Sequence, residues 1–125
     1  MTDQTRIILL AHGSSDPQWC RTFESLAEPT LEAVPQSVVA YMELSAPSLE
    51  QVVSESVHQG FQRFVVLPLF LAAGRHLRKD VPAMIATLEE QYDTTISLAP
   101  PIGENPHLGQ AIRSVVEDTL EASHG

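Results

Sequence analysis

The sequence contains little of what several protein classes require. Of its 125 residues only Cys20 is a cysteine, which excludes an internal disulfide framework and a cysteine-based structural zinc site. Lysine and arginine number 7 against 16 aspartate and glutamate residues, so the net charge is −9. A chain this acidic repels phosphate backbones. We therefore expect no nucleic-acid partner.

Long apolar runs and phosphate-binding loops are also missing from the sequence. The N-terminal apolar run, residues 7–11, is too short for the core of a signal peptide or for a membrane span. We accordingly expect a cytoplasmic protein that has no membrane partner. The sequence also lacks a glycine-rich phosphate loop and a Gly-x-Ser-x-Gly elbow, so neither ATP use nor serine hydrolysis has support.

What the sequence does have is typical of one compact domain, which we place at residues 1–125. Apolar residues make up 43% of the chain, enough for one core at this length. Four short apolar runs recur, at residues 7–11, 38–42, 64–71 and 95–98. The first three runs are nearly continuous, as expected for strands that are covered on both faces.

Segments with helical spacing separate and follow these runs. Asp16-Pro17 is typical of an N-cap and a first helical residue, and Pro29 is expected to end or kink the helix that follows. Further helices are predicted to begin near Pro47, at Asp80 and at Asn105-Pro106. The expected apolar stripes are Trp19, Phe23, Leu26 and Ala27 in the first helix, and Leu108, Ile112, Val115, Val116 and Leu120 in the last.

Strands that alternate with amphipathic helices predict a fold of the α/β class. We expect a single doubly wound, three-layer domain with a mostly parallel four-stranded sheet. In such a sheet, ligands bind beyond the carboxyl ends of the strands. The segments predicted there contain His12, Glu43 and His76, which follow three different strands. Two imidazoles and one carboxylate are therefore predicted on one rim.

Each of these three residues also has a structural interpretation. His12 could cap the first strand by bonding a neighbouring carbonyl, although the adjacent Gly13 permits close approach of the backbone to a ligand. Glu43 could be the polar end of a strand, and His76 a solvated loop residue. The segment 75–79 holds three of the seven basic residues. It is either a solvated loop or a local positive site for an anionic substrate.

Three segments together resemble the small CbiX-type chelatases. These segments are Leu-Ala-His-Gly-Ser-Ser-Asp-Pro at 10–17, Tyr-Met-Glu-Leu-Ser-Ala-Pro-Ser-Leu at 41–49 and Leu-Pro-Leu-Phe-Leu-Ala-Ala-Gly-Arg-His-Leu-Arg-Lys-Asp-Val-Pro at 67–82. They occur in the family's order and span most of the chain. One departure is Ser15, where relatives frequently carry arginine, and it puts any substrate contact by that side chain in doubt.

The resemblance implies a ferrochelatase-like fold and an ATP-independent chelatase of the lyase class. Such enzymes insert a divalent metal ion into sirohydrochlorin or a closely related tetrapyrrole, for cobalamin or sirohaem. It implies His12 and His76 as metal ligands, with Glu43 as an associated catalytic carboxylate. Co²⁺ is the first candidate, with Fe²⁺ or Ni²⁺ as alternatives; neutral imidazole suits all three. No prosthetic group is implied. Because double-length relatives look like two fused copies, we expect a homodimer.

The tetrapyrrole needs partners for its carboxylates and for its apolar ring. The residues that we assign to substrate binding are Ser14, Leu71, Ala72, Gly74, Arg75, Arg78 and Lys79. The segment 69–73 is expected to face the macrocycle or, alternatively, to complete the core. The alternative function is a non-catalytic tetrapyrrole carrier or a metal-delivery protein, and a purely structural partner protein is a third hypothesis.

Overall fold

A computed structural model describes residues 4–72 and 74–124, and the side chain of His76 lies outside that description. The strands are β1 (Thr5–Ala11), β2 (Ser37–Tyr41), β3 (Arg63–Pro68) and β4 (Thr95–Leu98). The α-helices are α1 (Pro17–Ala33), α2 (Leu49–His58), α3 (Arg75–Tyr92) and α4 (Pro106–His124), and a 3₁₀ turn, η1 (Ile102–Glu104), precedes α4. The predicted alternation of strands and helices is confirmed.

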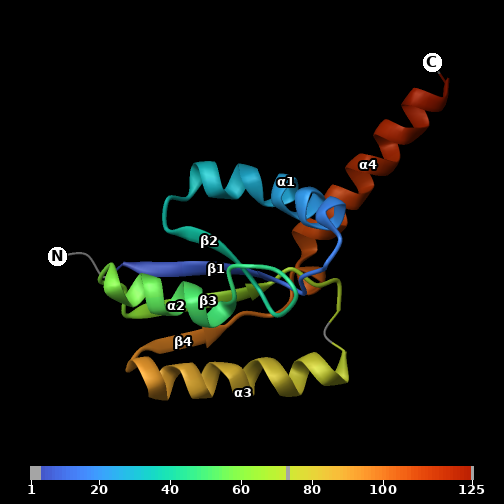
Figure 1. Ribbon diagram of the computed structural model, residues 1–125. Helices are drawn as coiled ribbons and strands as arrows, with labels where there is room; N and C mark the ends of the chain where they lie inside the picture. The colour runs from blue at the N-terminus through green and yellow to red at the C-terminus, as the bar shows by residue number, and fades with distance from the viewer. Residues whose placement is uncertain (1–3, 73, 125) are drawn as a thin grey trace.

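The four strands form one all-parallel sheet in the order β2-β1-β3-β4. In Figure 1, α1 lies on one face of the sheet, and α2 and α3 lie on the other. The larger core cluster fills the space between the sheet and α2 and α3, with Ile8, Leu10, Phe64 and Val66 among its members. The predicted three-layer α/β fold is therefore confirmed. None of the helices in the described residues is long and apolar enough to cross a membrane.

Helix α1 begins where the sequence predicts, because the Asp16 carboxylate accepts a hydrogen bond from the Gln18 N–H at 2.9 Å. Of the two outcomes expected at Pro29, an end or a kink, the end is wrong, since α1 continues to Ala33. Phe23 and Ala27 are buried, whereas Leu26, which was expected on the same face, is 75% exposed. The buried pair attaches α1 to the sheet, and one turn of helix beyond a proline is tolerated.

Tyr41, the last residue of β2, contacts α1 from the sheet. Its ring lies 5.6 Å from that of Phe23, and its hydroxyl donates to Glu24 Oε2 at 3.4 Å. Burial, followed by the charge of Glu24, raises the pKa of Tyr41 to about 12. The phenol therefore stays protonated, and remains a donor to α1, throughout the neutral range.

Two boundaries near the predicted rim differ from expectation. Strand β3 ends at Pro68 rather than residue 71, and α3 begins at Arg75 rather than Asp80. Asp80 with Pro82 resembles a helix start, but Leu77 already packs against the core on the same face as Val81. The basic segment 75–79 is therefore the first part of α3 and not a loop.

Gly103 in η1 locks the start of α4 against the segment that follows β3. Its N–H donates to Phe70 O at 3.0 Å, and a Cβ atom at this position would lie 1.6 Å from Leu71 O. Because the Leu71 carbonyl belongs to the backbone, moving it aside would cost folding free energy. Only glycine fits here without displacing residues 70–71.

We expect Gly103→Ala to destabilise the fold by about 1–3 kcal/mol, the usual cost of overpacking. Urea denaturation monitored by circular dichroism measures this loss. The matched control is Gly109→Ala, because a Cβ at Gly109 meets nothing within 4 Å and alanine favours the helix. Equal stabilities for the two variants would contradict the assigned role of Gly103.

Candidate functional site

The carboxyl ends of β1 and β2 bring His12 and Glu43 together. The parallel register pairs Ala11 with Tyr41, and the ladder continues past both strands. The Met42 N–H donates to Ala11 O at 2.9 Å, and the Glu43 N–H donates to His12 O at 3.1 Å. Both side chains are exposed. Residues 31 positions apart thus stand on neighbouring strand ends, as the topology predicts.

Gly13 permits this close approach of the two loops. Its φ is +95°, a left-handed conformation that a residue with a side chain rarely adopts. A Cβ atom here would lie 1.7 Å from Glu43 O. The backbone at Gly13 therefore fits against Glu43 only because no side chain is present.

Ser45 holds the same two loops together through its hydroxyl. Ser45 Oγ accepts from the Ser14 N–H at 3.1 Å and donates to Ser14 O at 2.8 Å. Cys20 on α1 completes the cluster, with its Sγ 3.3 Å from Ser45 Oγ. The residues next to Ser45 in the sequence do not indicate this role, because its hydrogen-bond partner, Ser14, lies in another loop. One hydroxyl thus closes the loop of His12 onto the loop of Glu43.

His12 and Glu43 open onto one cavity of about 630 Å³. The remaining lining residues are Met42, Gly74, Leu77, Asp80, Ala83 and Met84. Leu77, Asp80 and Met84 share one face of α3, at positions i, i+3 and i+7. Asp80 was not predicted to line a cavity, because the sequence placed the start of α3 at this residue. Extending the helical period back to Leu77 would have found it.

The imidazole of His12 is held against a buried ring. The centroids of His12 and Phe70 lie 4.4 Å apart, and the two planes are tilted by 40°. Phe70 itself is only 6% exposed. The segment after β3 therefore contacts the imidazole ring at the wall of the cavity.

His76 is the second residue of α3, whose N-terminal half forms the far wall of this cavity. Among the side chains that the structure describes, no three of His, Cys, Asp and Glu gather closely enough to hold a metal ion. The His76 side chain is not one of those described. The pairing of His12 with His76 therefore stays a prediction.

The predicted basic residues lie on different sides of α3. Arg78 lines a second cavity of about 300 Å³ with Phe70, Leu98, Pro100 and Glu104, among others, and this cavity shares Leu77 with the cavity of His12. Arg75 and Lys79 are exposed and line neither of these two cavities. The positive residues are thus spread around the first turns of α3 rather than gathered in one loop.

The other predicted substrate residues also separate into groups. Gly74 lines the larger cavity, while Leu71 and Ala72 are exposed. Ser14 Oγ accepts from the Asp16 N–H at 3.0 Å, which gives it a structural use as well. Within the segment 69–73, Leu69 packs against the α1 cluster and Phe70 is buried, so these two residues complete the core. Ala73 lies outside the described residues.

The arrangement offers an exposed imidazole and an exposed carboxylate at the mouth of an open cavity. Imidazole binds first-row divalent metals, and a carboxylate accepts protons or binds the same ions. A site with few protein ligands leaves coordination positions for another molecule. The geometry suits transient handling of a metal ion better than its permanent storage.

Known proteins with similar sequences identify the family of this chain. The family description that matches is CbiX, over residues 6–119. A sirohydrochlorin cobaltochelatase of Methanocaldococcus jannaschii is 33% identical over 89 residues, which span 70% of this chain and 62% of that protein. The enzyme of that name from Saccharolobus solfataricus is 24% identical over 125 residues, covering 94% of this chain and 98% of that one.

Solved structures lead to the same family. A CbiX protein from Marinobacter aquaeolei VT8 has a TM-score of 0.95 and 59% identity, covering 98% of this chain and 99% of that chain. The sirohydrochlorin chelatase SirB from Bacillus subtilis subspecies spizizenii, in complex with cobalt, has a TM-score of 0.80 and 26% identity. The match covers 92% of this chain but 50% of SirB. The match over residues 6–119 shows that this chain belongs to the CbiX family.

Proposed function

We propose that this protein inserts a divalent metal ion into sirohydrochlorin or a closely related tetrapyrrole, without ATP. The observation that carries the proposal is the placement of His12 and Glu43 at the mouth of one open cavity walled by α3. The names of the curated relatives and the cobalt complex of SirB support the same reaction. Co²⁺ is the first candidate for the metal, with Fe²⁺ and Ni²⁺ as alternatives.

The reaction exchanges two pyrrole N–H protons for one M²⁺ ion. We assign the metal to His12, together with His76 from the first turn of α3. One or two neutral imidazoles bind the ion and still release it to four pyrrole nitrogens. Glu43, on the neighbouring loop, is assigned to accept pyrrole protons as a general base or to assist the metal.

The substrate carboxylates need positive or hydrogen-bonding groups at the cavity edge. Arg75, Arg78 and Lys79 are assigned to them, together with free N–H groups at the start of α3. The N-cap of α3 is Gly74, which supplies no side-chain cap. Leu71 and Ala72 are exposed, so we assign them to the apolar ring, and Ser14 to a polar contact at its edge.

We also propose that the chain is a single catalytic domain, that it is located in the cytoplasm and that it forms a homodimer. Cobalt insertion belongs to cobalamin synthesis and iron insertion to sirohaem synthesis.

The competing functions predict different behaviour. A tetrapyrrole carrier or metal-delivery protein binds its cargo without accelerating insertion above the uncatalysed rate, and a structural partner protein binds neither ligand saturably. One assay tests all three functions. It monitors metal insertion through the absorption spectrum of sirohydrochlorin, with Co²⁺, Fe²⁺ and Ni²⁺ in competition.

We expect His12→Ala to lower the rate of cobalt insertion at least 100-fold, because the variant loses a metal ligand at the mouth of the cavity. Glu43→Gln keeps the shape of the side chain but cannot take up a proton, so we expect a loss of about 10²–10⁴. Absorption spectroscopy with sirohydrochlorin and Co²⁺ measures both rates.

His58→Ala is the matched control for these variants. His58 is exposed at the end of α2, where its Nδ1 lies 2.8 Å from Ser54 O, and it does not line the cavity. It should retain the wild-type rate. Wild-type insertion rates for both His12→Ala and Glu43→Gln, with unchanged circular dichroism spectra, would contradict the assigned roles of the two residues.

Ser45 is proposed as a positioning residue, because its hydroxyl links the loop of His12 to the loop of Glu43. Ser45→Ala leaves the part-buried Ser14 N–H without its acceptor, which costs about 1–3 kcal/mol of folding free energy. We also expect kcat to fall about tenfold, because the loops of His12 and Glu43 separate, while the KM for Co²⁺ changes less.

Steady-state kinetics and urea denaturation measure the two effects of Ser45→Ala. Thr87→Ala is the control, since that hydroxyl bonds only Ala83 O within its own helix. If Ser45→Ala lost stability but kept its kcat, the role of Ser45 would be structural alone.

A further inference from the structure

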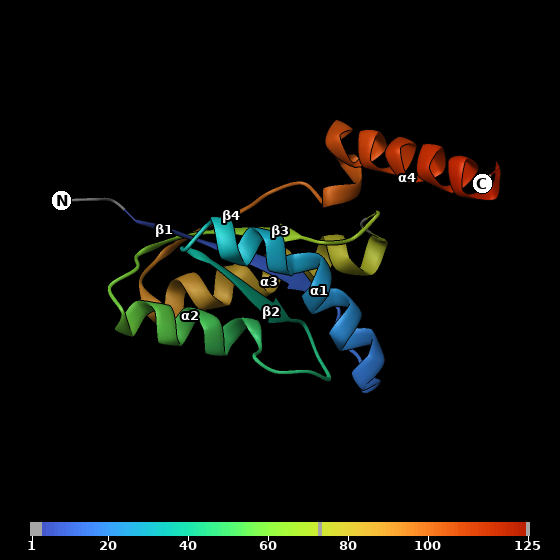
Figure 2. The same cartoon turned by 90° about the horizontal axis from the view of Figure 1, so that it is seen from above.

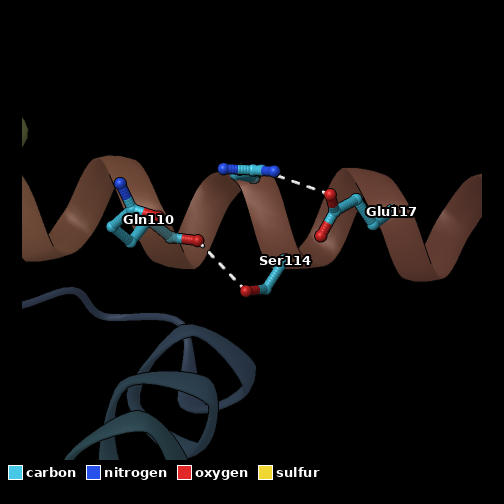
Figure 3. Close-up of polar contacts among 4 residues, drawn as sticks. Gln110, Ser114 and Glu117 are labelled. Carbon is cyan, nitrogen blue, oxygen red and sulfur yellow. Dashed lines mark hydrogen bonds and ion pairs between the residues drawn. The ribbon is translucent and has the colours of Figure 1, made fainter.

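Large apolar side chains that are exposed to solvent lie in three places in the described part of the chain. One is the stripe of α4, in which no residue is buried, so the prediction that this stripe joins the core is wrong. Figures 1 and 2 show α4 leaving the body, and contacts such as Ser114 Oγ donating to Gln110 O at 3.1 Å stay within the helix (Figure 3). The second place is α1, with Trp19 and Leu26. The third is the carboxyl end of the sheet.

Three exposed leucines at the carboxyl end of the sheet, Leu44, Leu71 and Leu98, form this third group, and we call them the rim leucines. Each lies at or just after the end of a different strand, β2, β3 or β4. The sheet order places the end of β1, and with it His12, between the segments that carry Leu44 and Leu71. Figure 2 shows β1, β2 and β3 ending on the same side of the molecule. Exposed apolar side chains gathered in this way are typical of a binding surface.

Leu44 differs from the other two rim leucines because its backbone is strained. Its φ is +65°, and the Ser45 N–H donates to Glu43 O at 2.8 Å across it. A hydrogen bond from residue i+2 to residue i around a positive φ defines the γ-turn that is rare and strained. A branched side chain is seldom found in this region of backbone space. Strain of this kind persists only where surrounding contacts enforce it, and it is concentrated at functional sites.

Contacts on both sides of Leu44 enforce the turn. Before it, the Glu43 N–H donates to His12 O at 3.1 Å, and after it, Ser45 Oγ donates to Ser14 O at 2.8 Å. The loop of His12 therefore fixes the turn, while the side chain of Leu44 is 69% exposed. Leucine costs stability here in two ways, because the backbone is strained and the apolar side chain stays in water. A bound apolar partner would offset this cost.

We propose that Leu44 is a substrate-contact residue, which packs on the apolar ring of the tetrapyrrole next to Glu43. The inference rests on the proposed function, because that function supplies the ring. A flat ring whose pyrrole nitrogens reach His12 and Glu43 extends over the loops beside the cavity. Leu44 is bonded directly to Glu43 but does not line the cavity itself, which suits a contact with the ring beyond the cavity. Because the turn is already fixed, binding costs little further backbone freedom at this position.

Leu44→Asn in the full chain tests this contact. Asparagine has nearly the shape of leucine, but it is polar and adopts a positive φ more readily. We expect the Kd for metal-free sirohydrochlorin, measured by fluorescence titration, to rise about tenfold or more, because the apolar contact is lost. The KM for Co²⁺ should stay unchanged. The urea midpoint should rise, because the backbone strain is relieved. Weaker binding by a more stable protein is a result that damage to the fold would not give.

Leu26→Asn is the matched control, since Leu26 is 75% exposed on α1 and lines neither the cavity of His12 nor that of Arg78. It should keep the wild-type Kd for sirohydrochlorin. A wild-type Kd for Leu44→Asn, in a protein whose wild type inserts Co²⁺, would overturn this inference and leave the proposed function standing.

Two other results would also overturn the contact. A lower kcat for Leu44→Asn at an unchanged Kd would assign Leu44 to the placement of Glu43. A changed sedimentation mass would assign it to an interface between chains. If the wild-type chain neither binds sirohydrochlorin nor inserts Co²⁺, the proposed function fails and this inference fails with it.

Discussion

The candidate site depends on one close backbone contact, between Gly13 and the carbonyl of Glu43. A Cβ at Gly13 would lie 1.7 Å from that oxygen, so this approach is open to glycine alone. The contact continues the β1–β2 ladder beyond the strands and sets His12 and Glu43 on adjacent loop ends. Ser45 then closes the loops with two hydrogen bonds. The relative position of the imidazole and the carboxylate follows from backbone packing, before any ligand is present.

Helix α3 supplies the other wall and divides the rim in two. Leu77 lines both the cavity of His12 and the cavity of Arg78, so the two cavities adjoin along α3. Both cavities have apolar walls, but their charged groups differ: Glu43 and Asp80 line the first beside His12, whereas Arg78 and Glu104 line the second. A large, flat, acidic substrate needs both kinds of surface. This division is consistent with the proposed tetrapyrrole, whose ring is apolar and whose carboxylates lie at its edge.

The apolar face of α4 is left exposed by its own chain, with Ile112, Val115, Val116 and Leu120 each at least 50% exposed. In a doubly wound sheet, a helix that follows the last strand normally returns to cover it. Here the backbone of η1 is bound to the segment after β3, and α4 leaves the body of the domain beyond that contact (Figure 1). The apolar stripe of α4 therefore stays in contact with solvent in a single chain.

Local patterns in the sequence were sufficient for the fold and for much of the rim. Continuous apolar runs predicted the strands, helical spacing predicted the helices, and parallel topology placed His12 and Glu43 at one edge, because each signal acts over a few residues. Tertiary structure decided the rest. Whether Asp80 began a helix or lay inside one depended on the packing of Leu77, and the function of Ser45 depended on a loop 31 residues away. The stripe of α4 has the same period whether its own core or another surface covers it, so only the path of the chain through space separates the two.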